Sequence, residues 1–116
     1  MIDLQTLESI YLVQGSTDLR KGIDGYASIV SGELDLDPFS KSIFMFCNRN
    51  KDKVKILYWD GNGFWLFYKR LEQGKFRWIL NEEGALELSH QQLRWLFEGL
   101  DIEHKRAFKA MKDKVI

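Results

Sequence analysis

Short runs of apolar residues, separated by turn-forming residues, fill the middle of this chain. Four runs are dense in the aromatic and β-branched residues that favour strands, at 42–47, 53–59, 64–70 and 76–80. The segments between them carry glycine, asparagine or aspartate, at 48–52, 60–63 and 73–74. Because three short turns join four successive strands, the pattern predicts an antiparallel meander.

A further strand and an amphipathic helix are predicted before the meander. The strand covers residues 10–13, and Thr17 is the expected N-cap of the helix, with Asp18 in its first turn. The expected buried stripe is Leu19, Ile23, Tyr26, Ala27 and Val30. Gly22 and Gly25 each weaken such a helix by about 1 kcal/mol relative to alanine. They suggest either the close approach of another backbone or a frayed or kinked helix, and a loop containing Pro38 follows at 31–42.

The last third of the chain is predicted to be helical. Ser89 and Gln92 have the spacing of a capping box, with Leu88 and Leu93 in the flanking staple positions. The expected buried stripe is Leu93, Leu96, Phe97 and Leu100, and Gly99 is the expected terminator. A second short helix is predicted over 103–112, with Ala107, Phe108 and Met111 on one side.

These elements fit one α+β domain spanning residues 1–116. We expect a four- or five-stranded, mostly antiparallel meander sheet with one N-terminal helix and one or two C-terminal helices. The N-terminus lacks the basic start and apolar run of a secretory signal, and no apolar stretch approaches the roughly 20 residues of a membrane span. A cytoplasmic location is therefore expected.

Charge is distributed unevenly, although the chain carries 17 basic and 17 acidic residues. Residues 1–40 have a net charge of −5, since two basic residues stand against seven acidic ones. Residues 41–77 have a net charge of +6, since nine basic residues stand against three acidic ones. Such a local excess can attract a polyanion. The alternative is that lysines on the hairpins keep the edges of the sheet from pairing.

The hairpin formed by 53–59 and 64–70 interleaves cations with aromatic rings. Lys55 and Trp59 share one face of the first strand. A loop of odd length would place Trp65, Phe67 and Lys69 beside them, whereas an even loop would place Phe64, Leu66, Tyr68 and Arg70 there. Either face resembles those that stack bases on aromatic rings and neutralise phosphates. The alternative is that both faces are packed, with lysine stems lying over the rings.

No catalytic or metal-binding pattern is visible. Cys47 lies in an apolar run, where a buried and inert thiol is expected. His90 and His104 have no ligand spacing to another histidine or cysteine, and the carboxylates form no convergent set. The glycine-rich turn at 60–63 leads into a strand rather than a helix, so turn chemistry explains it. We therefore expect that the protein is not an enzyme and that it binds no metal and no cofactor.

Arg94 and Trp95 lie beside the predicted stripe of the capped helix rather than on it. A tryptophan in this position is a candidate anchor for a protein interface. The alternative is a wide buried face that is contacted by the predicted terminal helix and includes Trp95.

Several motifs resemble those of one family of transposon proteins. They are 15–25 (GSTDLRKGIDG), 37–40 (DPFS), 46–49 (FCNR), 55–74 (KILYWDGNGFWLFYKRLEQG), 76–78 (FRW) and 92–95 (QLRW). Together they make the chain resemble the short second-reading-frame (TnpB-like) accessory proteins of insertion-sequence family 66, over about residues 10–101. Asn50 and Ile79 depart from that pattern, which usually has a basic residue and a proline there. The resemblance implies a role in DNA transposition beside a separate, larger transposase that carries the catalytic carboxylates.

Charge and resemblance together favour a non-catalytic accessory protein that binds nucleic acid. The candidate contacts are the cations and the two tryptophans between residues 49 and 77: Arg49, Lys51, Lys53, Lys55, Trp59, Trp65, Lys69, Arg70, Lys75 and Arg77. The alternative is an adaptor that binds the transposase or another accessory protein without touching DNA, using the acidic first forty residues and Arg94 and Trp95. A nuclease acting through Asp60 or Asp18 is a distant third hypothesis.

Overall fold

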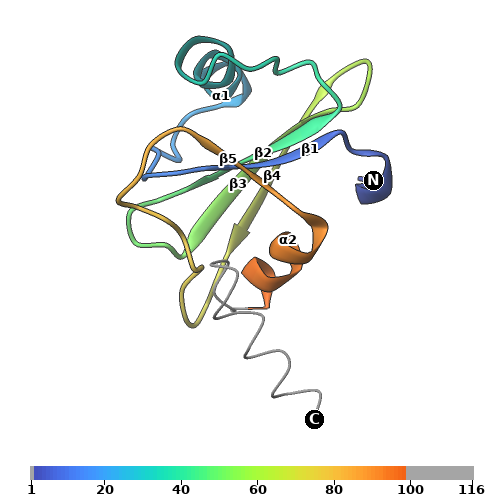
Figure 1. Cartoon of the computed structure of the whole chain (residues 1–116). Coiled ribbons are helices and arrows are strands. Elements are labelled where there is room, and N and C mark those ends of the chain that lie inside the picture. Colours follow the sequence, from blue (N-terminus) through green and yellow to red (C-terminus); the bar gives the residue numbers. More distant parts are fainter. Residues whose placement is uncertain (1, 99–116) are drawn as a thin grey trace.

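The computed structural model describes residues 2–98 and has a five-stranded sheet at its centre (Figure 1). The strands are β1 (Ser9–Val13), β2 (Ser42–Cys47), β3 (Lys53–Trp59), β4 (Phe64–Arg70) and β5 (Ala85–Leu88). Their order across the sheet is β4-β3-β2-β1-β5. β1 runs parallel to β2, and every other neighbouring pair is antiparallel. The predicted α+β class and mostly antiparallel sheet are confirmed.

Three of the predicted strands form the expected meander. β2, β3 and β4 have the predicted bounds, and each pairs with the next in sequence. All six residues of β2 are buried, since β2 lies between two other strands and is covered on both faces.

Helices lie on opposite faces of the sheet, as Figure 1 shows. The connection from β1 to the parallel β2 contains α1 (Ile23–Ser28), which continues directly into a π-helical turn, η2 (Ile29–Glu33). Parallel neighbours need such a crossover, whereas antiparallel neighbours do not. The second helix, α2 (His90–Phe97), follows β5, and a short 3-10 turn, η1 (Leu4–Thr6), precedes β1. None of the helices in residues 2–98 is long and apolar enough to cross a membrane.

The predicted strand at 76–80 is wrong. This segment is irregular, and the fifth strand is instead β5, which pairs with β1 and not with β4. Phe76 and Trp78 are nevertheless buried, because both side chains enter the core on one side of the segment. The indole Nε1 of Trp78 donates to the carbonyl of Val13 at 3.0 Å, and Gly15 N donates to the carbonyl of Ile79 at 2.8 Å. Tertiary packing therefore takes the place of a strand ladder here.

The predicted start of the first helix is also wrong. α1 begins at Ile23 with Gly22 as its N-cap, and no side chain caps it. Asp18 instead accepts a hydrogen bond from Arg20 N at 2.9 Å, a local turn that competes with helix formation. A Cβ at Gly22 would meet nothing within 4 Å, and one at Gly25 would meet only the Lys21 side chain. The two glycines are therefore explained by an irregular helix and not by the close approach of another backbone.

The C-terminal helix begins as predicted. Ser89 accepts from Gln92 N through its side chain, and Ser89 N donates to Gln92 Oε1 at 2.8 Å, so the capping box is formed. The predicted terminator Gly99, the stripe residue Leu100 and the helix at 103–112 lie outside the described residues.

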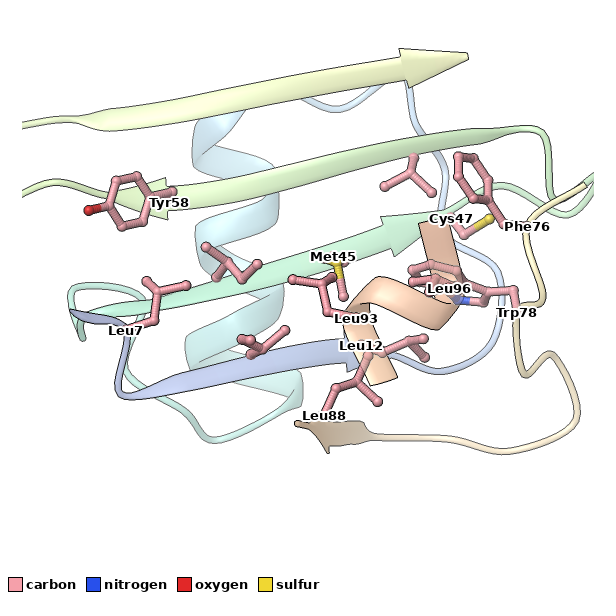
Figure 2. Packing of buried hydrophobic residues seen from close by; sticks show 13 residues of the cluster. Leu7, Leu12, Met45, Cys47, Tyr58, Phe76, Trp78, Leu88, Leu93 and Leu96 are labelled. Carbon is pink, nitrogen blue, oxygen red and sulfur yellow. The ribbon is translucent and has the colours of Figure 1, made fainter. Parts of the chain in front are cut away.

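Each face of the sheet carries its own apolar cluster. On the α2 face, α2 and the irregular segment cover a cluster that includes Leu12, Met45, Trp78 and Leu96 (Figure 2). On the α1 face, Tyr26 and Val30 pack with Phe44, Phe46 and Leu57. These two faces separate the candidate site residues.

Candidate nucleic-acid interface

The register of the β3–β4 hairpin decides which cations and rings share a face. Its four-residue loop pairs Lys53 with Arg70, Lys55 with Tyr68 and Trp59 with Phe64. The even-loop alternative is therefore correct, and these side chains lie on the α1 face. Trp65, Phe67 and Lys69 lie on the α2 face.

A groove opens on the α1 face beside the hairpin, and it has a volume of about 620 Å³. The segment before α1 forms one wall through Leu19 and Arg20, and the hairpin and its preceding turn form the other. The complete lining is Leu19, Arg20, Asn48, Lys53, Lys55, Leu66 and Tyr68. Three cations and one tyrosine therefore meet in a single groove.

Lys55, one of the residues that line this groove, is held in place by its neighbours. Its Nζ lies 5.9 Å from the centroid of the Tyr26 ring and 5.8 Å from that of the Tyr68 ring. The same Nζ donates to the carbonyl of Lys21 at 3.3 Å. Tyr68 itself keeps 55% of its surface exposed, so it remains open to a stacking partner.

Arg20 extends the groove from the opposite wall. Its Nε and one terminal nitrogen each donate to the Asp18 carboxylate at 3.0 Å. These bonds, with the bond from Arg20 N, lower the pKa of Asp18 to about 2. The guanidinium is oriented by this pair, yet the Arg20 side chain remains 91% exposed.

Arg20 was absent from the sequence-based set of contacts. It belongs to the acidic first forty residues and stands 33 positions before Lys53 along the chain. The parallel pairing of β1 with β2 brings the start of the crossover next to the hairpin. Two adjacent cations, Arg20 and Lys21, were the sole local signal.

A second group of cations surrounds the β2–β3 turn at the same end of the sheet. The turn is bonded to the segment after β4, since Leu71 N donates to Asp52 O at 2.8 Å and Phe76 N donates to Lys51 O at 2.7 Å. Lys75 Nζ also donates to the Asn50 carbonyl at 2.8 Å. The predicted contacts gathered here are Arg49, Lys51, Lys53, Arg70 and Lys75. Most of the predicted basic set therefore lies around one end of the sheet.

Acidic side chains moderate this basic end. Arg70 pairs with Glu72 at 2.7 Å. Asp52 accepts from the Asn48 side-chain amide at 2.7 Å, and this bond, together with nearby lysines, lowers the pKa of Asp52. Asn48 also accepts from Asp52 N and Lys53 N at 3.1 Å each, which fixes the turn.

The remaining predicted contacts lie elsewhere. Trp59 is half-buried at the other end of the hairpin, where it packs edge-on against Phe39 and Phe64 with centroids 5.0 and 4.9 Å away. Lys69 lies over the Phe97 ring on the α2 face, 5.6 Å from its centroid. Arg77 is exposed in the irregular segment. The structure therefore does not bring the predicted set together as one surface.

Trp65 is also on the α2 face, and it is tied to the hairpin loop. Its ring stacks on Phe67 at 5.8 Å, and its Nε1 donates to the Asp60 carboxylate at 2.7 Å. Asp60 further accepts from Asn62 N and Gly63 N, and these bonds lower its pKa. The turn interpretation of 60–63 agrees with this geometry. Among residues 2–98, no three histidine, cysteine or acidic side chains form a metal-binding group.

Arg94 and Trp95 differ in accessibility. Arg94 is exposed, whereas Trp95 keeps only 4% of its surface exposed. Trp95 is therefore buried rather than exposed, and the predicted terminal helix that would contact it lies outside the described residues. Arg94 instead lines an apolar groove of about 650 Å³ together with Ile2, Leu4, Leu93 and Phe97.

Comparison with known proteins gives a consistent assignment. The uncharacterized protein y4hO of Sinorhizobium fredii is 37% identical over 95 residues, which cover 82% of this chain and 83% of the relative. The uncharacterized protein y4jC of the same organism is 38% identical over 84 residues, 72% of each chain. No solved structure matches significantly. Residues 8–107 match the family of IS66 Orf2-like proteins. The chain therefore belongs to the IS66 Orf2-like family, which associates it with an accessory role in transposition.

Proposed function

We propose that this protein is a non-catalytic accessory factor of transposition that binds nucleic acid on the α1 face. One observation carries the proposal: Arg20, Lys53 and Lys55, from segments far apart in sequence, line one groove with the exposed ring of Tyr68. Ammonium and guanidinium groups neutralise phosphates, and an accessible ring stacks on bases. The cations around the β2–β3 turn extend this surface along the end of the sheet.

Sheet-edge protection alone would not require such an arrangement. Lys53 and Lys55 lie on β3, which is paired on both sides, so neither protects an edge. Arg20 lies outside the sheet and is oriented toward the same groove by Asp18. A polyanion accounts for all three positions at once.

The test is fluorescence anisotropy of labelled duplex and single-stranded DNA, titrated with the protein over a series of salt concentrations. The logarithm of the binding constant should fall linearly with the logarithm of the salt concentration. The slope should be about −0.9 per neutralised phosphate for duplex DNA and about −0.7 for single strands. The double variant Lys53→Ala/Lys55→Ala should flatten the slope by about two such contacts. The matched control, Lys41→Ala/Arg94→Ala, likewise removes two cations, but both of these are exposed and neither lines the groove.

Two results would overturn the proposal. One is an absence of binding to either DNA form at low salt. The other is an equal effect of the groove variant and the control, which would indicate diffuse attraction without a defined surface. Cleavage of the DNA in the presence of Mg²⁺ or Mn²⁺ would contradict its non-catalytic part.

An adaptor that binds the transposase, or another accessory protein of the same element, is the second candidate. The observation favouring it is the apolar groove beside α2, with Arg94 at its rim and Phe97 37% exposed. Capture of the purified transposase should then be lost on Arg94→Glu/Phe97→Ser. The variant Lys53→Ala/Lys55→Ala should leave capture unchanged, since its side chains lie on the other face.

A further inference from the structure

β4 is an edge strand with an open hydrogen-bonding side. It is the outermost strand of the sheet next to β3, as Figure 2 shows at the top. All seven of its residues pair in continuous register with β3, so no bulge interrupts it, and it contains no proline. Among residues 2–98, no strand pairs with its other side.

The flanking hydrogen bonds show which backbone groups point outward. Leu71 N donates to Asp52 O, and Asp60 N donates to Gly63 O, so residues 63 and 71 direct their backbone groups toward the β3 side. Antiparallel ladders alternate between bonded and non-bonded pairs. The outward N–H and C=O groups therefore belong to Phe64, Leu66, Tyr68 and Arg70.

The edge has little of the protection that sheets normally use. Natural edges carry charges, prolines or bulges that block pairing with another strand. On β4 the charges are confined to one end, Lys69 and Arg70, while Trp65 is 48% exposed and Tyr68 is 55% exposed. The strand therefore offers an accessible ladder flanked by exposed rings.

We propose that two copies of this chain pair through β4, antiparallel and about a two-fold axis at Phe67. A two-fold axis perpendicular to the sheet keeps each face continuous, so only residues on the same face can lie opposite one another. Centring the axis on Phe67 uses the whole strand. It sets Lys69 of one copy opposite Trp65 of the other, and Arg70 opposite Phe64.

This register is the one that the side chains favour. Each cation faces an aromatic ring, which permits cation–π contact, and no like charges lie opposite each other. Moving the axis to Tyr68 leaves Phe64 and Trp65 without a partner. Moving it to Lys69 sets the two lysines against each other. The partner is thus a second copy, because the strand is complementary to itself.

Pairing would also join the two candidate grooves. Leu66 and Tyr68 both line the groove, and in this register Leu66 of one copy lies opposite Tyr68 of the other. The α1 faces would then form one surface related by two-fold symmetry. This consequence rests on the proposed function, whereas the pairing itself rests only on β4.

Disulfide trapping tests the register. Phe67 would face its own copy in a non-bonded pair, with Cα atoms about 4.5 Å apart, within disulfide range. Phe67→Cys should therefore give a two-chain species on mild oxidation. Trp65→Cys and Lys69→Cys are matched controls, because the Cα atom of each would lie about 14 Å from that of its own copy. Neither should cross-link alone, but a mixture of the two should. The native Cys47 is buried, which raises its pKa to about 12, so it should not interfere.

Solution mass provides an independent measurement. Sedimentation equilibrium of the full chain should give twice the 13.7 kDa of one chain as concentration rises. Tyr68→Pro removes an outward N–H without removing a hydrogen bond to β3, so this variant should have the mass of one chain. Tyr68→Ala keeps that N–H, so this variant should still form the two-chain species. Should Tyr68→Pro fail to fold by circular dichroism, the cysteine variants still decide the question.

The mass of a single chain at all concentrations would overturn the pairing of two copies. The open side of β4 would then be available only to an extended segment of another protein. Cross-linking of Trp65→Cys alone, without Phe67→Cys, would overturn the register. The pairing and the proposed function can fail separately. A two-chain species that ignores DNA contradicts only the function, and a single chain that binds DNA contradicts only the pairing.

Discussion

At the scale of single residues, the groove depends on side chains whose positions are fixed by neighbours. Lys55 is held between two tyrosine rings, and Arg20 is held by Asp18. The sequence allowed Lys53 and Lys55 to be placed on one face of a hairpin, because the turns of that hairpin are predictable from local residues, and both line the groove. It could not indicate Arg20, whose place depends on a crossover between distant strands.

The Asp18–Arg20 pair should be visible in the titration of Asp18. The pKa of this carboxyl is lowered to about 2 from an ordinary value of 3.8, first by the side-chain bond from Arg20. Any stabilisation from the pair is therefore present above about pH 4 and is lost as the pH falls toward 2. In the variant Arg20→Ala the pKa should return toward 3.8. NMR titration of the carboxyl carbon measures this, and an unchanged low value would show that Arg20 is not the cause.

At the scale of elements, the sequence predicted an element correctly where its partner lies close to it in the sequence. The bounds of β2, β3 and β4 were predicted correctly because short turns join these strands. The start of α2 was predicted correctly because its capping box consists of residues 89–92, which are consecutive in sequence. The strand predicted at 76–80 failed because strand propensity does not reveal whether a ladder partner is present. The start of α1 failed because Asp18 serves a turn as readily as a helix cap.

The cap of α2 should contribute measurably to stability. Ser89→Ala removes the side-chain acceptor for Gln92 N and should lower the free energy of unfolding by about 1 kcal/mol. Ser89→Gly should cost only a few tenths of a kcal/mol. Urea denaturation followed by circular dichroism measures both. Equal costs for the two variants would contradict the assignment of Ser89 as N-cap.

At the scale of the whole molecule, the irregular segment after β4 joins parts that are far apart in the chain. It leaves β4 at one edge of the sheet and supplies β5 at the other. On the way it is bonded to the β2–β3 turn through Phe76 N and to β1 through the Trp78 indole. Its two buried rings were recognisable as apolar residues, but their route across the sheet was not.

Trp78 should therefore stabilise the fold through its indole hydrogen bond as well as through the packing of its ring. Trp78→Phe keeps a ring in the core but leaves the Val13 carbonyl without its indole donor, and should cost about 1–3 kcal/mol of unfolding free energy. Trp59→Phe is the control, since Trp59 is half-buried and packs only by its ring. Thermal or urea unfolding compares the two. A control as costly as Trp78→Phe would mean that the indole bond contributes little.

The place of β1 inside the sheet has a consequence for the kinetics of folding. β1 pairs on one side with β2, and on the other side with β5, where Ile10 faces Leu88 across 78 positions of sequence. The meander from β2 to β4 needs only short loop closures, whereas the β1–β5 contact must close a loop almost as long as the described chain. We expect the meander to form early and the β5 edge to join last. A chain emerging from the ribosome would then hold β1 incompletely paired until its last third had been synthesised.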